Sequence, residues 1–424
     1  MDPTLSTQDV MLAIALIFGI ATACQLVAPR LRIPSLVLLL PAGFLLGLVA
    51  PQWRADALLG PSFPVIVELV VAVILFQGGL GLTTIPLPKD QRVIVRRLLY
   101  IGAPLTWLGA TFAAHVLLGM DWPIAFMLGA ILIVSGPTVV TPILDFARPN
   151  ATVRGILQWE GTLLDPLGAL IAVVTFQVVK ASSSTGPVEA VELFVGGLLV
   201  AVVAAAIGVA FFVVGGLLAK GNKTLGTQVL LGSVIVTAGL ANSVSDDSGL
   251  LAALLMGMAA PRVAARFGTS LEGGMAFFDT IVSIAIGVLF VSIAGLVPSP
   301  IVLSLLLPTL GVALFLMVLV RPLVAAVATR RSVLSRNERV FVGWMDPRGI
   351  VAAATASSVG TVLVALRIPG AAELLPAAFI VIAITVTTYG LTAVPVARRL
   401  GIQAADNPSE AGGSPSGSAT AHSG

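Results

Sequence analysis

Two carboxylates, Glu160 and Asp165, lie in the segment QWEGTLLDPLGALIAVVTF, which is otherwise apolar and long enough to cross a bilayer. A charge buried in a membrane costs on the order of 3 kcal/mol or more on insertion scales, so such residues usually mark ion or proton pathways. A carboxylate can hold either a proton or a monovalent cation. If its empty, charged form cannot cross the membrane, competition between the two ligands produces obligatory exchange.

Asp165 is the best candidate for this exchange site. Pro166 has no N–H, which leaves the Thr162 carbonyl without its helical donor, and the Thr162 hydroxyl lies one turn before Asp165. Oxygen ligands of this kind suit Na⁺ or K⁺. We expect Ser135 and Thr138, from an earlier segment, to complete the cation site. The alternative is that Asp165 is a structural, hydrogen-bonded carboxyl group.

Glu160 is expected to serve another partner, because five residues place it roughly 140° around an ideal helix from Asp165. Arg348 is interpreted as the only basic residue in the membrane interior, where a permanent positive charge needs a buried anion. We therefore expect a Glu160–Arg348 ion pair. The alternative is that Asp346, two residues earlier, neutralises Arg348 locally.

Two other carboxylates lie nearer the ends of apolar segments. Glu68 falls one turn inside the third such segment, and Asp279 falls near one end of the tenth. Both are candidates for lining the entry funnels of an ion pathway. The alternative is that each side chain only extends to the membrane surface.

The composition shows which elements must position these residues. Of the 424 residues, 57% are hydrophobic and 10% are charged, and the mean hydropathy is +1.06. A soluble domain of this length could not hide so much apolar surface, so the sequence predicts an all-α polytopic membrane protein. Thirteen apolar segments are expected to cross the bilayer: 10–28, 35–50, 64–83, 98–119, 123–145, 154–179, 190–219, 225–244, 248–260, 273–296, 300–326, 339–366 and 374–396.

The charge distribution supports this count. Most of the 23 Lys and Arg residues fall in alternate connections. By the positive-inside rule this places the N-terminus outside and the C-terminus in the cytoplasm, in a membrane that we expect to be the inner membrane of a prokaryote. The formal net charge of +3 follows from the same bias and requires no nucleic-acid partner. Residues 401–424 are rich in Gly, Ser, Ala and Pro and are expected to form a disordered tail.

Helix breakers interrupt two of the thirteen segments at mid-depth. Gly136 and Pro137 interrupt the fifth, and Pro347 and Gly349 interrupt the twelfth. Unwound backbone at that depth must face protein or a water-filled cavity, because lipid cannot satisfy its hydrogen bonds. The two segments occupy matching places in segments 1–6 and 8–13. This pattern predicts an inverted repeat whose broken helices cross at the midplane.

The sequence lacks the motifs of several enzyme classes. It contains no G-x-x-x-x-G-K-[ST] sequence for ATP, no H-E-x-x-H and no G-x-S-x-G. We therefore expect a gradient-driven transporter with no cofactor, rather than an enzyme. A sodium-coupled symporter of a small organic anion is one alternative. An intramembrane aspartyl protease is a remote one, since no G-x-G-D motif is present.

Four stretches resemble the monovalent cation/proton antiporter superfamily, particularly its sodium/proton exchanger-like branch: LFQGGLGL at 75–82, SGPTVVTPIL at 135–144, WEGTLLDPLGA at 159–169 and WMDPRGIVAAATA at 344–356. The resemblance implies that Asp165 binds cation and proton, and that Glu160 and Arg348 support it. Two departures stand out. Leu164 replaces the Asn that precedes the family's aspartate, and Ser135-Gly136-Pro137 replaces a Thr-Asp-Pro.

The resemblance also implies a domain arrangement and a mechanism. Helices 1–3 (residues 1–94) and 7–10 (181–298) would form a dimerising scaffold. Helices 4–6 (95–180) and 11–13 (299–400) would form a core that slides against this scaffold like an elevator. The expected partners are Na⁺ or K⁺ and H⁺ as substrates, the lipid bilayer, and a second copy of the chain in a homodimer.

Overall fold

The computed structural model describes residues 7–31, 33–60, 62–84, 87–181, 187–219, 222–245, 248–267, 274–297 and 299–404. The described residues are 87% helical and contain no strand, only an isolated bridge between Pro149 and Gln403. The predicted all-α fold is therefore confirmed. The tail expected beyond residue 404 lies outside the described residues.

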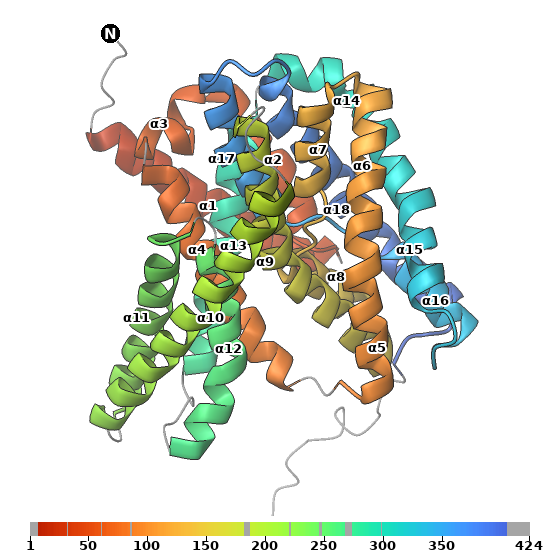
Figure 1. The fold of residues 1–424 in the computed structure, drawn as a ribbon. Helices are drawn as coiled ribbons and strands as arrows, with labels where there is room; N and C mark the ends of the chain where they lie inside the picture. Colours follow the sequence, from red (N-terminus) through yellow and green to blue (C-terminus); the bar gives the residue numbers. More distant parts are fainter. Residues whose placement is uncertain are drawn as a thin grey trace, which may run out of the picture.

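The helices follow the chain as one bundle (Figure 1). Their bounds are α1 (Thr7–Leu31), α2 (Leu36–Val49), α3 (Ala55–Leu59), α4 (Ser62–Thr84), α5 (Lys89–Arg97), α6 (Ala103–Leu118), α7 (Trp122–Ile131), α8 (Pro137–Ala147), α9 (Ala151–Ala181), α10 (Pro187–Leu218), α11 (Lys223–Asn242), α12 (Ser248–Phe267), α13 (Gly274–Gly295), α14 (Ser299–Phe315), α15 (Arg321–Ala328), α16 (Arg336–Trp344), α17 (Ile350–Ala365) and α18 (Leu374–Arg399).

These helices account for the thirteen expected crossings. Within the described residues, ten helical segments are long and apolar enough to cross a membrane alone. Single π turns make α5 continuous with α6, and α14 continuous with α15. The shorter α2 corresponds to one further expected segment, and the broken pairs α7/α8 and α16/α17 correspond to the other two. The ninth segment was predicted too short, because α12 continues through Pro261 to Phe267.

Glycines hold several helices of the expected scaffold at backbone contact. A Cβ atom added at Gly47 of α2 would lie 2.1 Å from the Gly295 carbonyl oxygen of α13. One added at Gly257 of α12 would lie 2.2 Å from the Phe76 carbonyl oxygen of α4. Small residues of this kind let membrane helices approach closely and gain packing energy. The helix pairs α2/α13 and α4/α12 are thus fixed together.

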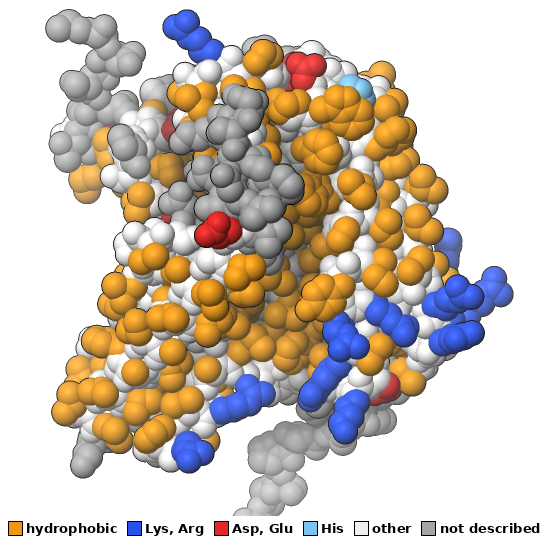
Figure 2. All heavy atoms as spheres, in the orientation of Figure 1, with side chains coloured by type: hydrophobic (Ala, Val, Ile, Leu, Met, Phe, Trp, Pro, Cys, Tyr) orange, Lys and Arg blue, Asp and Glu red, His pale blue; other side chains and the backbone are white. Residues whose placement is uncertain are grey.

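Basic side chains gather at one end of the bundle. Figure 2 shows most of the visible Lys and Arg residues at its lower end, around α5 and α16. Arg96 and Arg97 of α5 and Arg336 and Arg339 of α16 lie there. We call this the basic end, and the other the opposite end. The structure thus brings together basic residues that are far apart in the sequence.

Hydrogen bonds at the basic end join three separate parts of the chain. Asn150, between α8 and α9, donates from its backbone N–H to the Ile402 carbonyl over 2.8 Å and from its side chain to Glu338 Oε1 over 2.7 Å. The Ala404 N–H donates to the Arg148 carbonyl over 2.9 Å. The turn before α9, the start of α16 and the segment after α18 therefore form one connected unit.

Replacing Glu338 with Gln tests this unit through its pH dependence. Partial burial raises the pKa of the Glu338 carboxyl, but hydrogen bonds from Ser335 and Asn150 outweigh it and hold this pKa below the ordinary value of 4.5. A depressed pKa adds stability that is present above the ordinary value and lost as the pH falls through the lowered one. Glu338→Gln should therefore lower Tm most at neutral pH, and the difference from wild type should shrink on acidification below about pH 4.5. A constant difference between pH 7 and pH 3 would contradict the assignment.

Candidate ion-binding site

The two broken helices meet at their interruptions, as predicted. The helix α7 ends at Ile131 and α8 begins at Pro137, while α16 ends at Trp344 and α17 begins at Ile350. Between them, a Cβ atom added at Gly349 would lie 2.9 Å from the Gly136 nitrogen. The absence of side chains at both glycines therefore allows the unwound backbones to touch.

Asp165 of α9 lies directly against this crossing. It is 0% exposed, and neither carboxylate oxygen has a hydrogen-bond partner among the described residues. A Cβ atom added at Gly136 would lie 2.6 Å from Asp165 Oδ2, and one at Gly349 would lie 3.7 Å from Oδ1. Gly136 and Gly349 are the N-caps of α8 and α17, so the positive ends of two helix dipoles face the carboxylate. A buried carboxylate without a partner must take up a proton or a cation.

A cavity of about 350 Å³ leads from the basic end toward this crossing. Thr138 of α8 and Thr162 of α9 lie on its wall, whereas Ser135 is buried but does not line it. Within the described part of the chain, the Thr138 hydroxyl and Gln158 Oε1 are buried there and have no hydrogen-bond partner. Asp165 lies beyond the end of the cavity, behind Gly136. The structure thus brings Thr138 and Thr162 into the approach to Asp165 and leaves Ser135 outside it.

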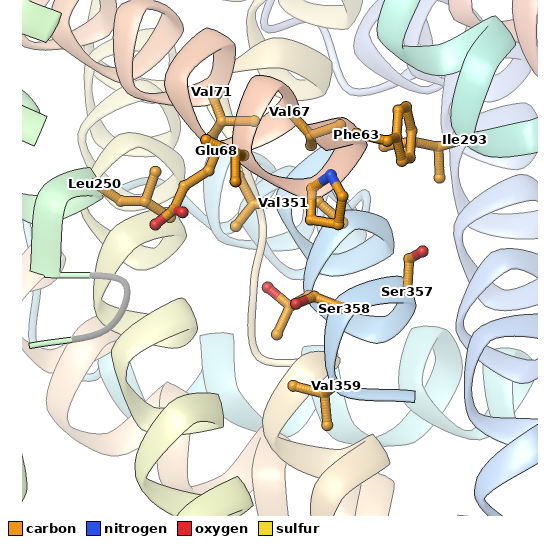
Figure 3. Close-up of a pocket in the computed structure, with 14 residues that line it drawn as sticks. Phe63, Val67, Glu68, Val71, Leu250, Ile293, Val351, Ser357, Ser358 and Val359 are labelled. Atoms are coloured by element: carbon orange, nitrogen blue, oxygen red, sulfur yellow. The ribbon is translucent and has the colours of Figure 1, made fainter. Parts of the chain in front are cut away.

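The two proposed funnel residues lie on two separate cavities. Asp279 of α13 lines the 350 Å³ cavity and accepts a hydrogen bond from Gln77 of α4 over 2.7 Å. Glu68 of α4 lines a cavity of about 130 Å³ at the opposite end and accepts a hydrogen bond from Asn242. Figure 3 shows Glu68 on one wall of this second cavity and Ser358 of α17 on another. Each cavity therefore has a carboxylate on a wall formed by a helix of the expected scaffold, α4 or α13.

Gly78 of α4 lines the cavity close to both α8 and α9. A Cβ atom there would lie 3.3 Å from Thr162 Cγ2 and 3.5 Å from Pro137 Cγ. Gly78→Val should therefore obstruct both the approach to Asp165 and any sliding of α9 past α4, lowering the exchange rate at least about tenfold, or about 1.4 kcal/mol. Gly81→Val is the matched control on the same cavity wall, because a Cβ there would meet no atom of the described residues within 4 Å. Rates from proteoliposomes check this, and equal effects of the two substitutions would contradict it.

The predicted Glu160–Arg348 ion pair is wrong. Glu160 accepts two hydrogen bonds from Arg321 of α15, over 2.6 and 2.9 Å, and the two residues are each 3% exposed. Arg348 pairs with Asp346 over 2.7 Å, which is the local alternative. Arg321 also lies 3.9 Å from Asp346. Two acids and two bases thus form one balanced, buried cluster.

Arg321 is the functional residue that the sequence interpretation missed. The charge pattern assigns Arg321 to a connection between crossings, which leaves Arg348 as the only basic residue expected in the membrane interior. The expected segment 300–326 nevertheless includes Arg321, and this position was a usable signal. Asp346 and Arg348 are only two residues apart in the interruption between α16 and α17, so they pair with each other. Glu160 is then available to pair with Arg321 of α15.

Two further contacts define the surroundings of the crossing. Arg348 Nη1 donates to the Ile133 carbonyl over 3.4 Å, which places a positive charge at the end of α7. Leu164 is 6% exposed and packs with Ala103 and Ile133 in a small apolar cluster. The residue before Asp165 therefore supplies packing rather than a ligand.

Any ion held at this crossing must be bound mainly by oxygen atoms of one carboxylate, hydroxyl groups and the backbone. Among the described residues, no group of three or more His, Cys, Asp or Glu side chains lies close enough together to hold a metal ion. Hard oxygen ligands of low total charge suit a monovalent cation better than a divalent one.

Comparison with known proteins agrees with this fold. Residues 12–399 match the family model described as "Sodium/hydrogen exchanger, transmembrane". The "Na(+)/H(+) antiporter 1" of Methanocaldococcus jannaschii is 25% identical over 375 residues, covering 82% of each chain. The "Na(+)/H(+) antiporter NhaH" of Halobacillus aidingensis is 23% identical over 415 residues, covering 93% of this chain and 98% of that one.

A solved structure has the same fold. The structure of the sodium proton antiporter MjNhaP1 from Methanocaldococcus jannaschii at pH 8 superposes with a TM-score of 0.75. The alignment covers 92% of this chain and 98% of that chain, at 22% sequence identity. At that identity the likeness establishes the shared fold and leaves the ion to be argued from the site.

Proposed function

Because this chain belongs to the sodium/hydrogen exchanger family of transmembrane proteins, we propose that it exchanges Na⁺ or K⁺ for protons at Asp165. One observation carries the proposal. The Asp165 carboxylate is 0% exposed and has no hydrogen-bond partner among the described residues, and it lies at the crossing of two broken helices near a cavity lined by Thr138 and Thr162. A group in this position is stable only when a proton or a cation neutralises it.

A single carboxylate predicts electroneutral exchange. Asp165 holds one proton or one monovalent cation, so each cycle moves one positive charge in each direction. The charges nearby are already balanced, since Glu160 pairs with Arg321 and Asp346 pairs with Arg348. Leu164 adds no second titratable group to the site. Transport should depend on pH because the two ligands compete for the same oxygen atoms.

Alternating access is proposed to occur by an elevator movement. The core, residues 95–180 and 299–400, would carry Asp165 past the scaffold, residues 1–94 and 181–298. Two features support this division: the scaffold pairs α2/α13 and α4/α12 are in backbone contact, and hydrogen bonds at the basic end connect separate parts of the core. In one state of the cycle the cavity lined by Thr162 would give access to Asp165, and in the other state the cavity lined by Glu68 would do so.

The proposal also covers the orientation of the chain in its membrane and its assembly into a dimer. The chain is an integral membrane protein, and we place its basic end in the cytoplasm of a prokaryote, with the N-terminus outside. We also propose that two copies associate through their scaffolds into a homodimer. Mass measurement by light scattering in detergent tests the dimer, and labelling of single cysteines placed near each terminus tests the orientation.

The two alternative functions have no structural observation in their favour. A small organic anion would be held by the N-termini of α8 and α17, whereas these already face the Asp165 carboxylate, and Arg321 and Arg348 are both paired. An aspartyl protease would need a second free carboxyl beside Asp165, whereas Asp346 is held by Arg348. The family match over residues 12–399 places the chain among transporters.

Everted vesicles that contain a pH-sensitive dye test the proposed function. After respiration acidifies the interior, addition of NaCl, KCl or LiCl should release protons when the added cation is a substrate. The series identifies the cation, and a response to Na⁺ alone would restrict the proposal to sodium. Absence of a response to all three salts, with the protein shown to be present and folded, would overturn the proposal.

A further inference from the structure

A groove at the basic end of the bundle lies between α15, α16 and α18. Its volume is about 740 Å³, and Figure 2 shows basic side chains over this region. Its floor is apolar, with Ala325 and Ala326 from α15 and Val396 from α18. Arg336 and Arg339 of α16 lie at its rim. None of these residues belongs to the ion site.

The groove changes from charged to apolar along the length of α16. Arg336 and Arg339 are three residues apart, so both guanidinium groups lie on one face of the helix. Trp344 also lines the groove, about 12 Å from Arg336 along the helix axis at 1.5 Å per residue. Its indole N–H donates to Thr392 over 3.1 Å, which fixes the ring as a wall. A ligand that fits has an anionic end and an apolar end.

We propose that this groove binds an anionic phospholipid of the leaflet at the basic end. The phosphate would accept hydrogen bonds from Arg336 and Arg339, and an acyl chain would lie along Ala325, Ala326 and Val396. Guanidinium groups match phosphate oxygens geometrically, and basic pockets between membrane helices at this depth bind acidic headgroups. Charge complementarity favours an anionic lipid over a zwitterionic one, whose choline or ethanolamine group would face the two arginines.

The position of the groove connects lipid binding to the crossing. The helix α16 carries both arginines and runs directly into the interruption that ends at Gly349, next to Asp165. A bound lipid would therefore hold α16, and with it the N-terminal end of α17, in place. The inference does not rest on the proposed exchange of cations, because binding is measured without transport.

Lipid retention by the purified protein tests the proposal. The protein in detergent is incubated with phosphatidylglycerol, with phosphatidylcholine or with inorganic phosphate, and bound lipid is measured by native mass spectrometry. Wild type should retain phosphatidylglycerol over phosphatidylcholine by up to about thirtyfold, which is about fivefold for each of the two arginines near the membrane surface. Arg336→Gln should remove most of this preference, and Arg336→Lys should keep most of it.

Two controls separate the groove from general surface charge and from misfolding. Arg266→Gln removes an exposed arginine at the same end but on α12, and should leave the preference unchanged. Arg339 is left intact, because it also donates to the Leu334 and Ser332 carbonyls and so supports the turn before α16. Equal retention of the two lipids by wild type, or an unchanged preference in Arg336→Gln, would overturn the proposal. Inorganic phosphate displacing the lipid completely would also overturn it, since the apolar floor would then contribute nothing.

Discussion

Asp165→Asn should abolish cation-driven proton movement in proteoliposomes while leaving a folded protein. An amide cannot release a proton near neutral pH, and it offers a cation no negative charge. The substitution changes little in shape, and the carboxylate has no hydrogen-bond partner among the described residues to lose. The rate should therefore fall to that of empty liposomes, with Tm unchanged or higher. Dye-monitored proton flux and thermal unfolding of the same preparation check this prediction.

Asp279→Asn is the matched control for this loss. Asp279 lines the cavity that approaches Asp165, but it is exposed and accepts a hydrogen bond from Gln77. Removing the negative charge of Asp279 should raise the KM for the cation and leave the maximal rate near that of wild type, because this carboxylate attracts the cation without exchanging it for a proton. If Asp165→Asn kept its activity while Asp279→Asn lost it, the exchange site would lie at the mouth of the cavity instead.

Arg321→Met should destabilise the protein by about 3–5 kcal/mol, the usual cost of leaving one partner of a buried ion pair uncompensated. Glu160 is 3% exposed and would lose both guanidinium hydrogen bonds. Replacing both residues with Met should restore most of the stability, since apolar side chains of similar volume often substitute for a buried pair. Thermal unfolding in detergent measures all three proteins.

The reciprocal double variant distinguishes the two pairings. Glu160→Met combined with Arg348→Met should stay less stable than the Glu160/Arg321 double variant, because it leaves Arg321 and Asp346 only their weaker contact at 3.9 Å. If this variant were rescued and the Glu160/Arg321 variant were not, Glu160 would pair with Arg348 and the arrangement described above would be incorrect.

The crossing of the broken helices could be predicted from the sequence because it depends on local properties. Pro137 and Gly349 stand inside apolar segments, and a break at that depth has to be buried against protein or water. The number of crossings follows from hydrophobic length and from the alternation of charged connections. Each of these signals is contained in a single stretch of about twenty residues.

The ion pairs could not be predicted in the same way because they depend on contacts between helices. Glu160 and Arg321 are 161 positions apart, and only packing shows that they meet. Arg321 also lies near the end of its crossing, where an arginine usually extends to the surface and is not expected to be buried. The packing role of Leu164 could not be predicted either, because it depends on a contact with Ala103 of another helix, α6.

Proton release on cation binding tests the central claim most directly. Purified protein in weakly buffered detergent solution is brought to a pH at which the site is protonated, and NaCl or KCl is then added while the pH is recorded. Competition for one carboxylate predicts one proton released per cation bound in wild type, and none in Asp165→Asn. Calorimetry measures cation binding in the same samples. Exchange at this residue would be contradicted if wild type bound the cation without releasing protons, or if Asp165→Asn released as many protons as wild type.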